Sequence, residues 1–500
     1  MSLLNERRFA RRARFLARGV WCVVIAGCAG ATARAPDAIA MQPAARAASP
    51  DTDTATAREV RFAETFDAAW RVVYERHFDT TFNGVNWVAV RAELLPRARA
   101  ARTLGELRGI IREMLGRLGQ SHFALIPGTE ADSLGTGGSD TTVGGTPGRI
   151  PVTGVDSEAP PPRLPDAVQE DRHAERPGTL GMELRLVGDR FYVSRVDSAG
   201  AAYGAGVRPG WEVLDVDHLS LESLVESAGH EREKDRGHFQ AALVAAGALD
   251  GAVGEVATIR AVDDRGRVHQ LSLRRREQAG TPVRFGNLPP LHAQLQHRRI
   301  RGAHGTTVGV ISFNIWMPLI LRQFDEAIDD LRDTDGIVID LRGNPGGVAA
   351  MVMGTSGHFL NERVTLGTMK TRDNELRFVS NPRRVDVSGR RIVPYAGPLA
   401  ILIDGLTGST SEMFAGGLQA IGRAKVFGET SAGQVLPALS ARLPNGDVLY
   451  YAFADFLTAK GIRLEGRGVI PDVEVPLSRG DLLAHRDAPL DEAIRWIAAQ

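Results

Sequence analysis

The chain has 500 residues, which is enough for three or more domains at about 100–200 residues each. Its 60 basic residues balance 60 acidic residues, which argues against a strongly basic nucleic-acid binder or a polyanionic tail. Only two cysteines occur, Cys22 and Cys28, and only four of the basic residues are lysines. Thiol nucleophiles, disulfides and cysteine metal sites are therefore excluded from the body of the chain, and lysine chemistry has few candidates.

Residues 1–28 have the layout of a leader for export. An arginine-rich stretch precedes an apolar run at 19–27 that is too short to span a bilayer, and Cys28 follows it. The tetrapeptide that ends at Cys28, I-A-G-C, resembles a bacterial lipobox, so we predict a lipid attached to this cysteine. An ordinary cleaved signal, or a membrane anchor, is the alternative. Residues 29–59 are rich in Ala, Pro and Thr, and we expect a flexible tether there.

Residues 60–126 are expected to form an N-terminal helical domain. Apolar residues recur there at helical spacing, and Thr103 followed by Glu106 has the spacing of a capping box. The helix that this box opens is expected to end just before Ser121 and His122. Residues 127–177 are dominated by Gly, Pro, Ser and Thr without an apolar period, which predicts a disordered linker.

Residues 178–278 change to short alternating runs that are typical of strands. The segment 201–210, A-A-Y-G-A-G-V-R-P-G, followed by a strand, resembles a PDZ domain. That resemblance implies that Leu180, Gly181 and Met182 belong to a loop whose backbone N–H groups capture the C-terminal carboxylate of a peptide. A PDZ-like fold that serves only as a scaffold or a gate is the alternative.

Residues 284–480 alternate strands with helices, which is the pattern of an α/β layer structure, and residues 481–500 are expected to add a C-terminal helix. Three segments of this region resemble the C-terminal (tail-specific) processing serine peptidases. They are D-L-R-G-N-P-G-G at 340–347, D-G-L-T-G-S-T-S-E-M-F-A at 404–415 and G-R-A-K-V-F-G-E-T-S-A-G-Q at 422–434. The resemblance implies a multidomain α/β fold with a crotonase/ClpP-like ββα core, beside the helical domain and the PDZ-like β domain.

The resemblance places the nucleophile at Ser409 and the oxyanion-hole donors at the backbone N–H groups of Gly347 and Thr410. The position suits a nucleophile, because Ser409 follows a buried strand and a glycine turn at the entry of a helix. A glycine at 347 also lets the backbone approach a substrate carbonyl. Use of Ser409 or Ser411 as a helix N-cap is the alternative.

The best-known branch of these peptidases pairs the serine with a lysine 25 residues later, but position 434 is Gln, which cannot act as a base. The helical domain contains F-D-A-A-W at 66–70, G-V-N-W at 84–87 and L-G-R-L-G-Q-S-H at 115–122. In these segments it resembles the first core domain of tricorn protease and its relatives. That resemblance implies His122 as the base, Ser121 beside it, and Glu465 as the residue that orients the histidine through the serine. A packing role for His122, and pairing of Glu465 with Arg463 or Arg467, are the alternatives.

The sequence therefore predicts an exported serine endopeptidase that acts on peptides or unfolded protein C-terminal regions through an acyl-enzyme, without metal or cofactor. We expect it in the bacterial cell envelope, lipid-anchored in the periplasm, or secreted; nucleic acid is not an expected partner, and homo-oligomers are left open. Two alternatives remain. One is an inactive peptide-binding protein on the peptidase scaffold, suggested by Gln434. The other is acyl-CoA chemistry on a related core, for which the sequence has no pyrophosphate-binding feature.

Overall fold

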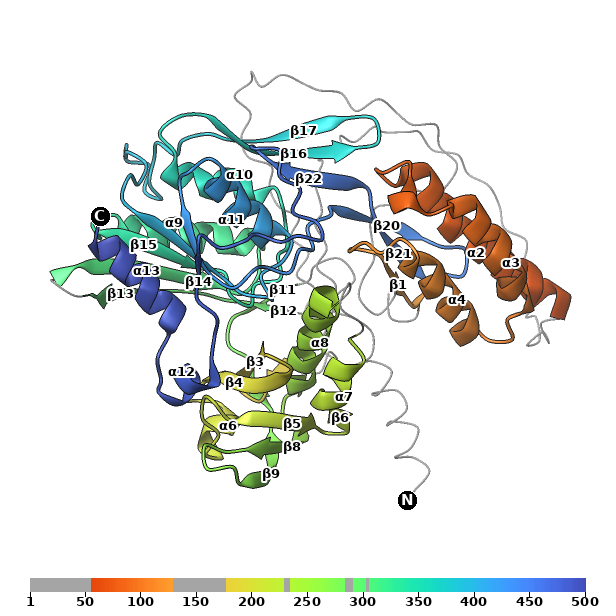
Figure 1. Ribbon diagram of the computed structural model, residues 1–500, viewed down its shortest axis with the longest axis horizontal. Coiled ribbons are helices and arrows are strands. Elements are labelled where there is room, and N and C mark those ends of the chain that lie inside the picture. Colours follow the sequence, from red (N-terminus) through yellow and green to blue (C-terminus); the bar gives the residue numbers. More distant parts are fainter. Residues whose placement is uncertain (1–54, 129–176, 229–233, 284–290, 303–304) are drawn as a thin grey trace, which may run out of the picture.

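The chain folds into a helical region, a middle β region and a larger C-terminal α/β region (Figure 1). The computed structural model describes residues 55–128, 177–228, 234–283, 291–302 and 305–500. The predicted leader with Cys28, residues 29–54 of the tether and residues 129–176 of the linker lie outside these ranges. Among the described helices, none has the length and apolar character needed to cross a membrane.

Three helices build the helical region, with a 3₁₀ turn between the first two. They are α2 (Ala55–Arg76), η1 (Phe82–Gly84), α3 (Trp87–Ala100) and α4 (Leu104–Gly116). The side chain of Thr103 accepts the Glu106 N–H at 3.1 Å, as the capping spacing predicts. The indole N–H groups of Trp70 and Trp87 donate to each other's backbone carbonyls at 2.9 and 3.2 Å, which clamps α2 to the start of α3.

A hairpin from the C-terminal region completes the core of the helical region. Strand β1 (Ala124–Ile126) pairs antiparallel with β21 (Val448–Ala452), which pairs with β20 (Ala438–Arg442). Apolar side chains of the hairpin share one buried cluster with those of α2, α3 and α4. Figure 1 shows the blue hairpin lying against the orange helices. We call β20 and β21 the arm; because residues 121–122 lie between α4 and β1, the arm positions them.

The middle β region is a sheet of the order β3-β4-β5-β8-β9, with β6 paired to β5. Its strands are β3 (Met182–Val187), β4 (Arg190–Val196), β5 (Glu212–Val216), β6 (Leu219–Ser220), β8 (Val256–Val262) and β9 (Val268–Arg274). A small second sheet joins β10 (Arg276–Glu277), β2 (Pro177–Thr179) and β7 (Asp250–Ala252). The helices are α6 (Ala201–Gly204), α7 (Leu221–Glu226) and α8 (Lys234–Leu249), and α8 packs on β3.

The C-terminal region is centred on a six-stranded sheet of the order β13-β14-β15-β18-β19-β23, parallel except for the edge strand β13. Its strands are β13 (Leu295–Arg301), β14 (Thr307–Phe313), β15 (Gly336–Asp340), β18 (Leu399–Ile403), β19 (Lys425–Gly428) and β23 (Val473–Glu474). A short pair, β11 (Thr281–Val283) and β12 (Leu291–Ala293), leads into it. The central strands are buried on both faces, as an α/β layer structure requires.

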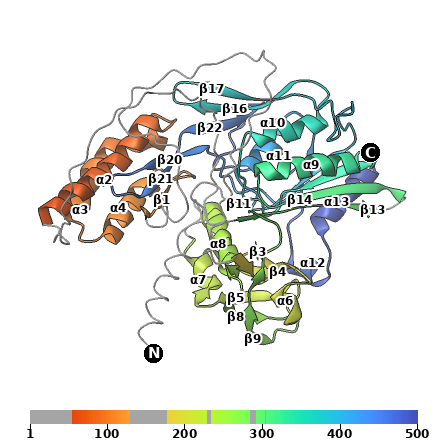
Figure 2. The ribbon, with the colours of Figure 1, turned by 180° about the vertical axis from the view of Figure 1, so that it is seen from behind.

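Helices cover both faces of this sheet. One face, with Ile339 and Ile401, packs against α9 (Pro318–Leu331), α10 (Met351–Ser356) and α11 (Thr410–Ala420), and the 3₁₀ turn η3 (Gly357–Phe359) follows α10. The opposite face, with Val338 and Leu402, packs against α13 (Ala488–Ala498), which follows α12 (Arg479–Leu483). Figure 2 shows this arrangement from behind. A second sheet of β17 (Glu375–Ser380), β16 (Val364–Thr371) and β22 (Ala454–Thr458) packs on α11.

Candidate active site

Ser409 occupies the N-cap position of α11, directly after β18 and the turn at 404–408. Its backbone has φ 53° and ψ −118°, a region that non-glycine residues rarely adopt and that persists only where the surroundings enforce it. The Ser409 N–H donates to the Gln434 carbonyl and to Glu412 Oε2, each at 2.9 Å. The hydroxyl oxygen is fully buried and has no hydrogen-bond partner among the described residues, so it is available for chemistry.

Ser411 has a different role from its neighbour. Its hydroxyl oxygen accepts the indole N–H of Trp316 at 2.8 Å. Trp316 is itself fully buried and packs against Phe313 and Phe414. Trp316 and Ser411 therefore belong to the packing that seats α11 on the sheet.

The loop at 341–347 lies against Ser409 and presents Gly347. A Cβ on Gly346 would lie 2.6 Å from the Ser409 Cβ, and a Cβ on Gly347 would lie 2.3 Å from the Trp316 carbonyl oxygen. Gly347 has φ 142°, so both its conformation and its surroundings require glycine. The Thr410 hydroxyl donates to the Gly347 carbonyl at 2.8 Å and holds the two residues together.

The backbone N–H groups of Gly347 and Thr410 donate no hydrogen bond to another described residue. Asn344 fixes the loop around them, because its Oδ1 accepts the Gly346 N–H at 3.0 Å and its carbonyl accepts the Gly408 N–H at 3.1 Å. Two unengaged donors beside a serine hydroxyl are the arrangement that stabilises a developing oxyanion.

Ser121, His122 and Glu465 form one buried hydrogen-bonded group. Ser121 Oγ lies 2.6 Å from His122 Nδ1 and 2.9 Å from Glu465 Oε2, and the Ser121 N–H donates to Glu465 Oε1 at 2.8 Å. Burial lowers the pKa of His122 to about 3, so the ring is neutral near pH 7. Burial raises the pKa of Glu465, while its three donors favour the carboxylate.

These contacts settle which histidine nitrogen carries the proton when Glu465 is ionised. The single hydroxyl proton of Ser121 then goes to the carboxylate, so Ser121 Oγ must accept from His122 Nδ1–H. Nε2 is left as an unprotonated acceptor, and it is buried without a partner among the described residues. A neutral imidazole with a free Nε2 is the form that a general base requires.

The segment 433–435 joins Ser409 to this group. The Gln434 carbonyl accepts the Ser409 N–H, and the next residue, Val435, donates its N–H to Glu465 Oε2 at 2.9 Å. The structure therefore brings all four residues of the predicted tetrad into one neighbourhood. Ser409 Oγ and His122 Nε2 do not hydrogen-bond to each other in this structure, since neither atom has a partner.

Arg463, one of the two arginines considered as partners of Glu465, pairs with another carboxylate. Arg463 Nε pairs with Asp455 Oδ2 at 2.5 Å, and Glu465 makes its hydrogen bonds to Ser121 and Val435. Lys425, on β19, lies over the rings of Phe427 and Trp496. Lys425 therefore takes no part in the group around Ser409.

Glu412 was not among the residues predicted from the sequence. It is fully buried, and its carboxylate accepts four hydrogen bonds, from the N–H groups of Ser409, Gly433 and Gln434 and from the Ser431 hydroxyl, at 2.6–3.0 Å. Burial raises the pKa of Glu412 to about 7 against these four donors. The S-x-x-E spacing after Ser409 was the available signal, because Glu three residues after an N-cap reaches back to the cap N–H.

The middle β region touches the nucleophile loop directly. Arg185 Nε donates to Asp404 Oδ2 at 2.9 Å, and the ring of Phe239 on α8 packs against Gly408. Leu180, Gly181 and Met182 lie between β2 and β3. The Leu180 N–H donates to the Leu249 carbonyl at 3.2 Å and the Gly181 N–H to Thr179 Oγ1 at 3.4 Å, so these two N–H groups are engaged within the region.

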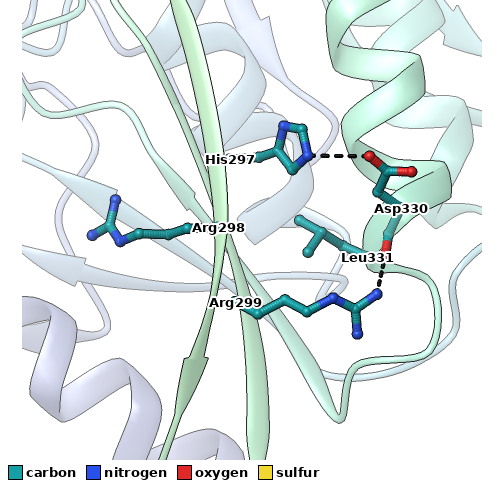
Figure 3. A pocket seen from close by; sticks show the side chains of 5 residues that line it. All are labelled: His297, Arg298, Arg299, Asp330 and Leu331. Carbon is teal, nitrogen blue, oxygen red and sulfur yellow. Dashed lines mark hydrogen bonds and ion pairs between the residues drawn. The ribbon is translucent and has the colours of Figure 1, made fainter.

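A surface hollow lies away from the predicted residues, between β13 and α9 (Figure 3). It is lined by His297, Arg298, Arg299, Asp330 and Leu331. His297 Nε2 lies 3.2 Å from Asp330 Oδ2, and Arg299 pairs with Asp333. None of the tetrad residues contributes to this hollow.

Two family models match the chain. Residues 307–475 match peptidase family S41, and residues 59–116 match the tricorn protease C1 domain. The first range holds the strands and loops around Ser409 and Glu465, and the second ends shortly before Ser121. The α/β region of the chain therefore contains a serine peptidase domain of family S41.

Similar proteins carry carboxyl-terminal-processing names. The chain is 25% identical over 423 residues to carboxyl-terminal-processing peptidase 2, chloroplastic, of Arabidopsis thaliana, covering 83% of this chain and 68% of that protein. It is 24% identical over 415 residues to the carboxyl-terminal-processing protease of Synechocystis sp., covering 82% and 80%.

Two solved structures share the fold. The photosystem II D1 C-terminal processing protease has a TM-score of 0.53 at 19% identity, covering 87% of this chain and 96% of that one. Mature CPAF complexed with lactacystin has a TM-score of 0.52 at 12% identity, covering 88% and 97%. At these identities the similarity concerns the multidomain α/β fold with its N-terminal helical region.

Proposed function

We propose that the chain is an endopeptidase whose nucleophile Ser409 is activated by His122, with Ser121 and Glu465 orienting the histidine. The observation that carries this proposal is the buried Ser121–His122–Glu465 group, which is joined to Ser409 through residues 434 and 435. It leaves His122 Nε2 without a partner, and the Ser409 hydroxyl also lacks one. A packing histidine has no need of a carboxylate relayed through a serine. This chain of contacts follows the logic of nucleophile, base and orienting acid.

In the proposed reaction, Ser409 Oγ attacks the scissile carbonyl carbon while its proton moves to His122 Nε2. The carbonyl electron pair moves onto oxygen, where the N–H groups of Gly347 and Thr410 stabilise it. The imidazolium then donates its Nε2 proton to the leaving amine, which leaves an acyl-enzyme. Water hydrolyses the ester with the same base, and Glu465 stabilises the imidazolium through Ser121 in both halves.

The substrates we propose are peptides or unfolded protein C-terminal regions. The similar proteins of Arabidopsis thaliana and Synechocystis sp. are named for carboxyl-terminal processing. We further propose that the middle β region is PDZ-like, because β3 is an edge strand with α8 packed beside it. Such an edge can accept an added peptide strand. Carboxylate capture by residues 180–182 requires that the Leu180 and Gly181 N–H groups exchange their present acceptors.

The predicted leader extends the proposal to export and lipid anchoring at Cys28. A lipidated, envelope-bound enzyme would meet unfolded envelope proteins at the membrane surface. Cells expressing the Cys28→Ser variant should incorporate no radiolabelled fatty acid into the protein and should release it from the membrane fraction. Unchanged labelling in that variant would contradict the lipid anchor and leave the peptidase proposal untouched.

The alternative is an inactive peptide-binding protein, which the missing hydrogen bond between Ser409 and His122 favours. Fluorophosphonate labelling of the purified protein separates the two. We expect the wild type to label at Ser409, Ser409→Ala to show no labelling, and His122→Ala to label at least about 10³-fold more slowly. His297→Ala, at the surface hollow, is the matched histidine control. A wild type that neither labels nor cleaves unfolded casein supports the inactive scaffold.

A further inference from the structure

Three buried polar atoms at the site lack partners among the described residues: Ser409 Oγ, His122 Nε2 and Gln434 Nε2. The side chains belong to residues that are 0%, 3% and 3% exposed. Buried polar groups are almost always hydrogen-bonded, so unpaired ones that gather in one place indicate a function. The roles proposed above use the first two atoms and leave the Gln434 amide unexplained.

Gln434 is tied to the nucleophile through its backbone. Its carbonyl accepts the Ser409 N–H at 2.9 Å, and its own N–H donates to Glu412 Oε2 at 3.0 Å, the same oxygen that accepts the Ser409 N–H. Glu412 therefore holds residues 409 and 434 against each other at a fixed spacing. The Gln434 side chain starts from this anchored backbone and ends within the buried interior.

Gln434 also lies next to the residues that bind Glu465, which orients the proposed base His122. The neighbouring Val435 N–H donates to Glu465, and the Gly433 carbonyl accepts the Gly466 N–H at 2.8 Å. Of the two proposed oxyanion donors, the Gly347 N–H comes instead from the loop at Gly346, which packs on the Ser409 Cβ. Gln434 Nε2 and Ser409 Oγ do not hydrogen-bond in this structure. An amide that reaches Ser409 from the side of the base would act on the attacking oxygen, whereas the oxyanion donors would act on the carbonyl oxygen.

The hydrogen-bonding capacities of the three atoms match as a chain. An amide nitrogen only donates, a serine hydroxyl both accepts and donates, and the unprotonated His122 Nε2 only accepts. We propose that Gln434 is a further catalytic residue, whose Nε2–H donates to Ser409 Oγ while Ser409 donates its proton to His122 Nε2. The amide keeps both its protons throughout and stabilises the negative charge that grows on Oγ as its proton leaves and its lone pair bonds to the carbonyl carbon.

This inference rests on the proposed function and has a test of its own. The second-order rate constant for fluorophosphonate labelling of Ser409 is measured from pH 5.5 to 8.5 for wild type, Gln434→Met and Gln434→Glu. Gln434→Met keeps the side-chain length and removes the donor, so we expect labelling about 10–100-fold slower at every pH. The matched control is Gln419→Met, whose amide donates to the Ile470 carbonyl on the exposed side of α11.

The pH dependence of labelling in Gln434→Glu distinguishes a catalytic role from a packing role, because a packing role would not make the rate depend on pH. Where the new carboxyl is protonated it supplies a donor, so its rate relative to wild type should approach one at low pH. It should then fall as pH rises and the carboxyl ionises. This comparison is internal to one variant, so it holds even if Gln434→Met folds poorly.

Three outcomes overturn the inference. The first is that Gln434→Met labels as fast as wild type, and the second is that the rate of Gln434→Glu relative to wild type does not change with pH. The third is that the fall in Gln434→Glu labelling at high pH parallels a loss of its folded protein by circular dichroism. A wild type that does not label at all contradicts the proposed function instead, so the two failures are distinguishable.

Discussion

The hydrogen bonds that hold the Ser409 backbone come from the C-terminal region, whereas His122 enters the site from the helical region. Ser409 follows a buried parallel strand, and its unusual backbone is held by Glu412 and Gln434, which belong to the same region. His122, the proposed base, depends on two contacts across regions: the hydrogen bonds from Ser121 to Glu465, and the arm that completes the helical core.

This difference indicates which substitutions should abolish activity while the structure around Ser409 stays intact. Ser409, Gly347 and Thr410 keep their geometry as long as the large sheet is folded. The base keeps its geometry only while the helical region stays docked. Changes to the base side should therefore abolish catalysis and leave the fold of the C-terminal region intact, and the following predictions test this.

The largest effect is expected from Glu465→Gln. The amide replaces one acceptor oxygen with an NH2 donor, so it cannot accept all three hydrogen bonds that Glu465 accepts. The imidazolium also loses its compensating charge, so His122 is no longer held in the tautomer that a base needs. We expect kcat to fall by about 10³–10⁴-fold with little change in KM. The matched control is Glu429→Gln, at a partly buried carboxyl that accepts the Leu477 N–H. An equal fall in both variants would show that Glu465 has no special role.

A smaller effect is expected from breaking the contact between α4 and the arm. Arg108 makes two hydrogen bonds to Asp447, at 2.9 and 2.7 Å, and Asp447 is fully buried. Arg108→Met leaves a buried carboxylate without its cation, which should lower the free energy of unfolding of the helical region by about 3 kcal/mol.

Hydrogen exchange separates this prediction from a general loss of stability. Faster exchange is expected at residues 87–126 and 438–452, with unchanged protection in β15 and β18. The Arg97→Met variant, which removes an exposed pair with Glu113, is the control and should change little. A uniform loss of protection across the chain would contradict the expectation that the structure around Ser409 is independent of the docking of the helical region.

The sequence could predict the nucleophile side more fully than the base side. Ser409 at the entry of a helix, Gly347 in a tight loop and the buried strands before them are local patterns, and the structure places them as expected. Their catalytic roles stay predictions. The placement of Ser121 beside Glu465 followed only from a family resemblance, because local periodicity carries no information on contacts between distant segments.

Neither the position of the arm nor the four hydrogen bonds that Glu412 accepts could be predicted from local patterns. The strand at 448–452 is apolar and buried along its whole length, which is typical of any core strand. Nothing in its own sequence indicates that β1, more than 300 residues earlier, is its partner. Glu412 sits in a spacing that usually marks an exposed helix cap, and only the folded loops at 431–434 turn it into a buried acceptor of four donors.

The smallest effect is expected in the pH dependence of the free energy of unfolding, to which His122 and Glu412 contribute with opposite signs. An unfolded chain binds a proton at His122 below about pH 6.5, but burial keeps the folded ring neutral down to about pH 3. The unfolded state then binds more protons in this window, so the free energy of unfolding falls as pH falls, by up to about 1.4 kcal/mol per pH unit. Glu412 acts the other way: burial raises its pKa from 4.5 to about 7, so stability falls as pH rises through that range.

Urea unfolding of His122→Asn and Glu412→Gln from pH 4.5 to 7.5 measures both contributions against wild type. The cost of His122→Asn should shrink as pH falls, because the wild type alone carries the penalty of keeping a neutral histidine. The stability difference for Glu412→Gln should shift in the opposite direction with pH. A cost of His122→Asn that is the same at every pH would mean that the ring is protonated alike in both states. His122 would then not be the buried neutral base that the proposed mechanism requires.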